Sequence, residues 1–141
     1  GPRQVLELFA TERALKAEPW LDEAGVRLHT KPERELTALV GTQDHQGAVA
    51  RVEPFRYADA HEVAAGPAPL IAVLDSVTDP RNLGAVVRSA EGAGASGVVL
   101  PAHNSARVTA AVCRASAGAV EHLPVAVVKN LSRYLAEIKG P

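Results

Sequence analysis

Residues 70–101, LIAVLDSVTDPRNLGAVVRSAEGAGASGVVLP, decide the fold of this chain. They begin with a continuous apolar run at 70–75, which is typical of a parallel strand that is covered on both faces. A helix is expected over residues 82–95, and the apolar segment at 97–101 predicts a second strand. A strand, a helix and another strand in this order predict a parallel sheet with helices packed against it.

The same alternation continues toward the C-terminus. The sequence predicts a helix over residues 105–118, a strand over 123–128 and a helix over 130–140. Ser116 and Gly118 mark an expected tight turn between the first of these helices and the strand. The fold class is therefore α/β, with a doubly wound parallel sheet of three strands, which is thin for this architecture.

A smaller unit with the order β-α-β-α-β is expected upstream. Its expected strands cover residues 4–9, 26–30 and 47–53, and its expected helices cover 11–25, interrupted at Pro19, and 32–41. Residues 54–69 contain three prolines and no sustained period, which marks a linker. The sequence thus predicts an N-terminal domain at 1–53, a linker at 54–69 and a C-terminal domain at 70–141.

Composition excludes several classes of protein. The 141 residues include one cysteine, Cys113, so an internal disulfide and a four-cysteine zinc site are both excluded, and a cytoplasmic location is expected. The five histidines are scattered without ligand spacing, so no metal is expected. No apolar run reaches the roughly 18 residues of a membrane-spanning helix, so no membrane partner is expected.

The formal net charge of −1 argues against nucleic-acid binding by bulk electrostatics alone. The charge is uneven, because residues 1–69 carry 8 basic and 11 acidic side chains whereas residues 70–141 carry 7 and 5. Four arginines of the second part lie in a stretch where Glu91 is the only acidic residue after Asp79, and the planar guanidinium of arginine suits phosphates and base edges: Arg81, Arg88, Arg107 and Arg114. An ordinary solvated helix face is the alternative interpretation of these arginines.

The segment at 74–90 joins the carboxyl end of a strand to a helix, which is where open α/β sheets bind their ligands. It lacks both glycine fingerprints of nucleotide-binding loops, G-x-G-x-x-G and G-x-x-x-x-G-K-[ST]. Asn82 is expected to cap the helix, and Arg88 follows about two turns farther along it. His45 and Gln46, in a loop before a strand, either reach RNA or form an ordinary turn. The residues alone thus predict an arginine-bearing ligand loop and leave the reaction open.

The segment at 74–101 and the stretch SAGAVEHLPVAVVKNL at 116–131 resemble the first half of a known catalytic domain. This domain belongs to the SpoU (TrmH-like) family of S-adenosylmethionine-dependent RNA ribose 2′-O-methyltransferases, and the likeness includes N-x-G-A-x-x-R-S-A at 82–90. Residues 4–53 resemble the L30e-like substrate-binding domain of the 23S rRNA guanosine 2′-O-methyltransferase branch. The resemblance implies a SPOUT-type (α/β knot) fold for residues 70–141.

The resemblance also implies roles for individual residues. Arg88 and Asn82 are expected in an active site that is completed across a homodimer. Arg88 would position or deprotonate the ribose 2′-hydroxyl, and because a guanidinium is a poor base near neutral pH, orientation and charge stabilisation are the better supported roles. Contacts to 23S rRNA are expected from Arg81, His45, Gln46, Arg107 and Arg114.

Members of the family continue with a G-x-E-G-x-G segment, an I-P-M strand and an S-L-N-V-S helix, which form the knot and the methyl-donor pocket. These motifs are absent from the 141 residues. The resemblance therefore places the S-adenosylmethionine pocket outside this sequence and implies guanosine 2′-O-methylation for the intact protein.

Other functions remain open at this point. The chain is alternatively a non-catalytic RNA-binding or assembly module, or it directs the same chemistry to a tRNA or to an antibiotic-resistance site in rRNA. Base stacking is expected to be limited, because the core can absorb the few aromatic residues: Phe9, Trp20, Phe55, Tyr57 and Tyr134.

Overall fold

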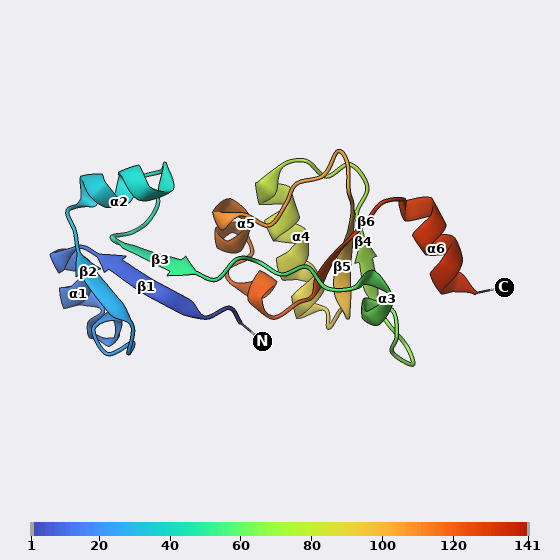
Figure 1. Ribbon diagram of the computed structural model, residues 1–141, viewed down its shortest axis with the longest axis horizontal. Helices are drawn as coiled ribbons and strands as arrows, with labels where there is room; N and C mark the ends of the chain where they lie inside the picture. Colours follow the sequence, from blue (N-terminus) through green and yellow to red (C-terminus); the bar gives the residue numbers. More distant parts are fainter. Residues whose placement is uncertain (1, 141) are drawn as a thin grey trace. The chain divides into compact units, whose positions relative to one another are not determined.

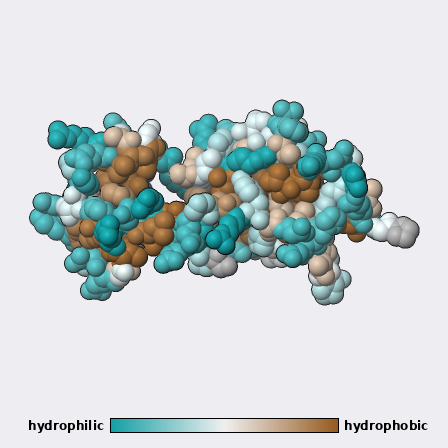
Figure 2. All heavy atoms as spheres, viewed as in Figure 1, coloured by the Kyte–Doolittle hydropathy of each residue, from teal (hydrophilic) through white to brown (hydrophobic). Residues whose placement is uncertain are grey.

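The computed structural model describes residues 2–140. The chain forms two compact units, one spanning Arg3–Pro54 and the other beginning at Phe55 (Figure 1). Hydrophilic side chains cover much of the surface of each unit, and hydrophobic residues form smaller patches among these hydrophilic side chains (Figure 2). None of the helices in the described part of the chain is long and apolar enough to cross a membrane.

The N-terminal unit contains a three-stranded sheet. Its elements are β1 (Val5–Ala10), α1 (Glu12–Ala17), the 3-10 helix η1 (Pro19–Leu21), β2 (Arg27–Thr30), α2 (Glu33–Val40) and β3 (Ala48–Val52). The strand order is β2-β1-β3, with β1 parallel to β2 and antiparallel to β3. The expected β-α-β-α-β order is confirmed, and α1 ends before Pro19 because proline lacks the backbone donor that a helix interior needs.

Helices cover both faces of this sheet. Leu8 and Ala10 of β1 pack with Ala14 and Leu21, from α1 and η1, in one apolar cluster. Leu36 of α2 is fully buried, and α1 and α2 lie on opposite sides of the sheet (Figure 1). Alternate residues of β1 therefore face different helices, as the period of a strand requires.

The C-terminal unit is built on a parallel sheet. Its elements are α3 (Ala60–Val63), β4 (Ile71–Val73), α4 (Pro80–Gly92), β5 (Gly97–Pro101), α5 (Ala110–Ala115), η2 (Ala119–Glu121), β6 (Val125–Val128) and α6 (Leu131–Lys139). The strand order is β4-β5-β6, and both pairings are parallel. The α/β class and the three-stranded parallel sheet are confirmed.

Both faces of this sheet are covered as well. Val98 and Leu100 of β5 pack in a cluster with residues of α4 and α5, whereas Val99 packs in another cluster with α3 and α6. All three β5 side chains are fully buried. The continuous apolar runs in the sequence reflect this double burial.

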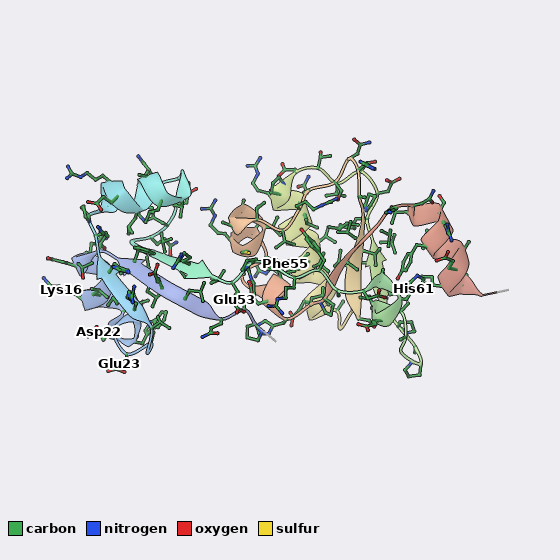
Figure 3. All side chains as sticks on the ribbon, viewed as in Figure 1. Lys16, Asp22, Glu23, Glu53, Phe55 and His61 are labelled. Carbon is green, nitrogen blue, oxygen red and sulfur yellow. The ribbon has the colours of Figure 1, made fainter. Side chains whose placement is uncertain are left out.

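The linker expected at 54–69 is wrong for residues 55–63, which belong to the C-terminal unit. Residues 55–63 pack onto the C-terminal unit: the backbone N–H of Ala58 donates to the Val125 carbonyl at 2.8 Å, and Ala60 and Val63 are buried. The Tyr134 hydroxyl donates to the Ala60 carbonyl at 2.8 Å, and burial raises the pKa of this phenol. Figure 3 labels Glu53 and Phe55, which flank the boundary between the units. The prolines of the region, at 54, 67 and 69, flank this short segment, so the sequence around it has the composition of a linker.

The start of α4 also differs from expectation. Asp79, not Asn82, is the N-cap, because its carboxylate accepts the backbone N–H of Arg81 at 2.7 Å. Pro80 occupies the first helical position, where a missing N–H carries no cost. Asn82 consequently lies inside the first turn, with its side chain exposed and not needed for capping.

The helix expected at 105–118 is limited to α5. Residues before Ala110 are held in another conformation, because the N–H of Ala106 donates to the Val77 carbonyl at 2.8 Å and that of Val108 donates to the Tyr57 hydroxyl at 3.0 Å. The turn expected after α5 is confirmed: Ser116 is buried and its hydroxyl donates to the Cys113 carbonyl at 2.9 Å.

Replacing Gly84 with alanine is expected to destabilise the C-terminal unit. A Cβ at this position would collide with the Ala115 Cβ and come within 2.9 Å of the Ser116 nitrogen. Overpacking of this kind costs about 1–3 kcal/mol, which outweighs the better helix propensity of alanine. Urea unfolding measures the loss. Gly92→Ala in the same helix is the matched control, because its added Cβ meets nothing within 4 Å, and equal stability of both variants would contradict the packing argument.

The Asp79 carboxyl is expected to titrate below 3.8 in the folded protein. Hydrogen bonds from Arg81, first from its backbone N–H, favour the charged form and lower the pKa of Asp79. Since the folded pKa is the lower one, the stabilisation is present above the unfolded pKa and is lost as pH falls through the folded value. NMR titration of the carboxyl carbon measures the midpoint, and a value at or above 3.8 would contradict this cap.

Candidate functional site

The outer face of α4 presents three of the expected site residues. Arg81, Asn82 and Arg88 are exposed, because Leu83, Gly84 and Val87 occupy the buried face of the same helix. Within residues 2–140, the side chains of Asn82 and Arg88 form no hydrogen bond or ion pair. At about 1.5 Å per residue, the two are separated by roughly 9 Å along the helix axis. Their polar groups are therefore available to a ligand.

Arg81 and Arg114 are also at the surface. The Arg81 side chain is 85% exposed and lies 3.5 Å from the Asp79 carboxylate, which offsets part of its charge. Arg114 is exposed in the last turn of α5. Neither side chain is buried in the core.

Arg107 has a different environment from the one expected. Its guanidinium donates to the Ala102 carbonyl at 2.5 Å and to the Pro101 carbonyl at 3.2 Å. These carbonyls stand at the carboxyl end of β5, so Arg107 ties the following loop to the end of the strand. The side chain is half-buried and serves the fold of this loop.

The loops at the carboxyl edge of the C-terminal sheet contain unusual backbone. Ser76, after β4, and Asn104, after β5, have φ values of 58° and 51°. Non-glycine residues rarely adopt this left-handed conformation, and it is enriched at functional sites. The same edge is where open α/β sheets bind ligands.

In the N-terminal unit, His45 is occupied by the fold. Its Nδ1 accepts the backbone N–H of Gly47 at 3.0 Å, so Nε2 carries the proton and donates to the Thr37 hydroxyl at 3.0 Å. Both ring nitrogens are thus used inside the unit. Of the two interpretations of this loop, ordinary turn chemistry describes His45.

Gln46 is placed differently by the same turn. Gln46 and Gly47 have φ values of 53° and 84°, and the N–H of Ala48 donates to the His45 carbonyl at 3.1 Å, which defines a type I′ turn. Gly47 is required here, since a Cβ would lie 2.8 Å from the Thr11 hydroxyl. The turn presents the exposed Gln46 side chain at the surface.

Gln46 lines a groove that the sequence did not reveal. The groove has a volume of about 630 Å³, and its walls include Arg13, Trp20, Glu33 and Gln46. Trp20 is 60% exposed, so the expectation that the core absorbs the aromatic residues is wrong for this one. The signal was the proline before it, which ends α1 and places Trp20 in a surface turn.

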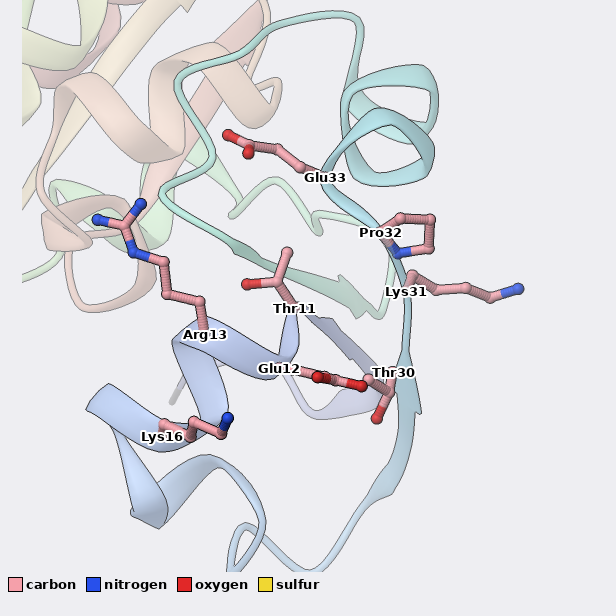
Figure 4. Close-up of a pocket in the computed structure, with 8 residues that line it drawn as sticks. All are labelled: Thr11, Glu12, Arg13, Lys16, Thr30, Lys31, Pro32 and Glu33. Atoms are coloured by element: carbon pink, nitrogen blue, oxygen red, sulfur yellow. The ribbon is translucent and has the colours of Figure 1, made fainter.

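A second groove of about 740 Å³ adjoins the first, since Thr11, Arg13 and Glu33 line both. Figure 4 shows Arg13 and Lys16 projecting from α1 and Lys31 from the segment before α2. Lys31 is paired with Glu35 at 3.1 Å. Among the described residues, Arg13 and Lys16 have no such partner, which leaves two cations beside the grooves.

Comparison with known proteins matches both units to one type of enzyme. The SpoU rRNA Methylase family model matches residues 69–141, and the model for RNA 2′-O ribose methyltransferase substrate binding matches residues 1–58. A Bacillus subtilis protein assigned to the TrmH family of tRNA/rRNA methyltransferases, YacO, is 34% identical over 97% of the chain. An uncharacterized tRNA/rRNA methyltransferase of Mycobacterium avium is 41% identical over 91% of it.

The fold matches solved structures as well. The SpoU methyltransferase AviRb from Streptomyces viridochromogenes superposes with a TM-score of 0.75 over 97% of this chain and 51% of that chain, at 22% identity. One structure of AviRb contains the cofactor AdoMet. The chain spans 59% of the length of the B. subtilis relative and 43% of the M. avium one. With one family model covering more than half of its residues, the chain belongs to the SpoU rRNA Methylase family.

Proposed function

We propose that this chain is the RNA-recognition domain and the leading half of the catalytic domain of an RNA methyltransferase. The proposed reaction transfers a methyl group from S-adenosylmethionine to the ribose 2′-oxygen of a guanosine in 23S rRNA, in the cytoplasm. The observation that carries the proposal is Arg88, exposed and without a partner among residues 2–140, inside the segment that resembles the family's first motif. The N-terminal unit would hold the RNA.

The chemistry of Arg88 fits charge stabilisation. The ribose 2′-hydroxyl becomes a nucleophile as negative charge develops on its oxygen, and a guanidinium supplies fixed positive charge and several N–H donors to that oxygen. A guanidinium does not accept the proton near neutral pH, since its own pKa exceeds about 12. Arg88 would therefore orient the hydroxyl and stabilise its charge, and the proton would leave to another acceptor.

The other expected residues divide into two groups. Asn82, Arg81, Arg114 and Gln46 are exposed, and we propose that Asn82 supports Arg88 while the others contact RNA. Both ring nitrogens of His45 and two guanidinium nitrogens of Arg107 form hydrogen bonds inside the fold, so we propose that these residues shape loops that reach the RNA. A homodimer would complete the active site, because α4 presents Arg88 outward.

The described residues do not fit the methyl donor by themselves. At the carboxyl end of β5, the carbonyls of Pro101 and Ala102 accept from Arg107. The N–H groups of Ala102 and Ala106 donate to the carbonyls of Val128 and Val77. These four backbone groups at the edge are thus already paired. We assign no residue of this chain to S-adenosylmethionine.

Arg88→Ala is expected to reduce methyl transfer by about 10²–10³-fold, the effect of removing one stabilising donor to a developing oxyanion. The assay joins the chain to the C-terminal remainder of the B. subtilis relative and follows label from S-adenosylmethionine into the ribose of 23S rRNA. Arg88→Lys is expected to recover part of the rate, since it restores charge without the planar fork.

Arg34→Ala is the control for this measurement. Arg34 is an exposed arginine on α2 with no assigned role, so its loss is expected to leave the rate unchanged. An Arg88→Ala variant that kept the full rate would remove Arg88 from the active site. Methylation mapped to a tRNA or to another nucleotide would keep the chemistry and change the substrate.

Calorimetric titration of S-adenosylmethionine tests the assignment of the donor. The 141-residue chain is expected to give no saturable heat, because the motifs that form the donor pocket in the family are absent from these residues, and the chimera is expected to bind at one site. Saturable binding to the 141 residues would show that a donor site was missed. A chimera that binds RNA and takes up neither donor nor methyl group would favour the non-catalytic alternative.

A further inference from the structure

The groove beside Trp20 is the strongest unassigned site of the chain. Trp20 is the only tryptophan, and it stays 60% exposed although indole burial is strongly favourable. Its indole N–H donates to the Glu18 carboxylate at 2.7 Å, which fixes the orientation of the ring. An aromatic face that is held in place and open to solvent is a surface on which a planar ligand stacks.

The polar groups around this face are those that read a nucleobase. Arg13, Glu33 and Gln46 line the same groove as Trp20. A guanidinium can donate to the O6 and N7 acceptors of guanine, and a carboxylate can accept from its N1–H and N2–H groups. Guanine offers both patterns on one ring, whereas adenine lacks the O6 acceptor and the N1 donor.

The two grooves differ in the charged residues that line them, and this difference favours a base in one and a phosphate in the other. Glu18 and Glu33 line the first groove with Arg13 as its single fixed cation, so a phosphate is disfavoured there. Lys16 lines the adjoining groove, which shares Arg13 with the first (Figure 4). A nucleotide would thus place its base beside Trp20 and its phosphate toward Lys16.

The turn that carries Gln46 is rigid before any ligand arrives. The His45 ring bonds the backbone of Gly47 and the Thr37 hydroxyl, and the N–H of Thr11 donates to the Gly47 carbonyl at 2.9 Å. Gln46 nevertheless keeps a left-handed backbone, which glycine would adopt at lower cost. The fold therefore does not require the Gln46 side chain, whose exposed amide can contact a ligand.

We infer that the groove formed by Arg13, Trp20, Glu33 and Gln46 binds an unpaired guanine of the RNA, stacked on the Trp20 ring. This inference rests on the proposed RNA substrate and adds a base-specific site within the N-terminal unit. A groove of about 630 Å³ lies in the size range of sites for small planar ligands. The site needs an unpaired base, because a base inside a duplex is stacked on both ring faces and its Watson–Crick edge is used in pairing.

Because Trp20 is the single tryptophan, the intrinsic fluorescence of the chain can report on this site. RNA hairpins of one stem are titrated into the 141-residue chain, with an unpaired guanine in the loop, with adenine in its place, or as a closed duplex. Trp20 fluorescence reports stacking, and the anisotropy of a label on the RNA reports binding independently. The guanine loop is expected to quench Trp20 and to bind at least several-fold more tightly than the adenine loop or the duplex.

Variants separate the site from the fold. Trp20→Ala is expected to lose about tenfold or more in affinity for the guanine loop, and Trp20→Phe is expected to lose less because it retains a stacking face. Gln46→Gly is expected to weaken binding while thermal stability stays equal or rises. Glu33→Gln is expected to reduce the preference for guanine over adenine. Leu39→Ala is the matched control, an exposed apolar side chain of the same unit outside the groove, at 57% exposure.

Each outcome decides a separate question. Tight RNA binding with unchanged Trp20 emission and full affinity of Trp20→Ala would overturn the stacking site and leave the proposed methyltransferase intact. Equal binding of guanine and adenine loops would overturn the base assignment. Absence of RNA binding by the chain would overturn the inference, while the methyl-transfer assay of the chimera judges the proposed function by itself.

Discussion

The central strand β5 imposes the constraint on which the C-terminal unit depends. Val98, Val99 and Leu100 are fully buried, so apolar side chains leave the strand on both faces and each face must be covered. Helices α4 and α5 cover one face, and α3 and α6 cover the other. The same requirement explains why residues 55–63 pack onto the sheet and do not form a linker. Without α3, part of the second face would be exposed to water.

Because one face of α4 packs against the sheet and α5, the residues of this helix form an inward row and an outward row. The inward row is fixed by packing, most strictly at Gly84, where the backbone of α5 leaves no room for a side chain. The outward row, with Asn82 and Arg88, has no packing duty. Stability therefore explains the glycine and leaves the arginine unexplained, and a polar group that the fold does not use is where a ligand contact is most reasonably sought.

Most of the elements could be predicted from the sequence, because periodicity reports burial directly and the strands here are apolar. The errors arise at caps, turns and loops, where the conformation depends on particular hydrogen bonds that apolar periodicity does not report. Asp79 replaces Asn82 as the cap because Pro80 takes the first helical position. The roles of His45 and Arg107 depend on carbonyl, amide and hydroxyl groups that only the fold brings near them. The exposure of Trp20 could not be predicted because it depends on η1, which leaves the indole outside the core.

The sequence makes both arginines and His45 candidates for ligand contacts, and the fold separates them by how many of their polar groups already form hydrogen bonds. Both ring nitrogens of His45 are used, so an RNA contact there would have to replace an internal hydrogen bond, whereas Arg107 has two of its guanidinium nitrogens bonded to carbonyls of its own loop. Arg88 and Arg13 give up no hydrogen bond or ion pair within residues 2–140 when they meet a ligand. Donors that bond their own loops thus fix the shape of the surface, and the donors without a hydrogen bond inside the chain are the ones that can bind the proposed RNA without such a loss.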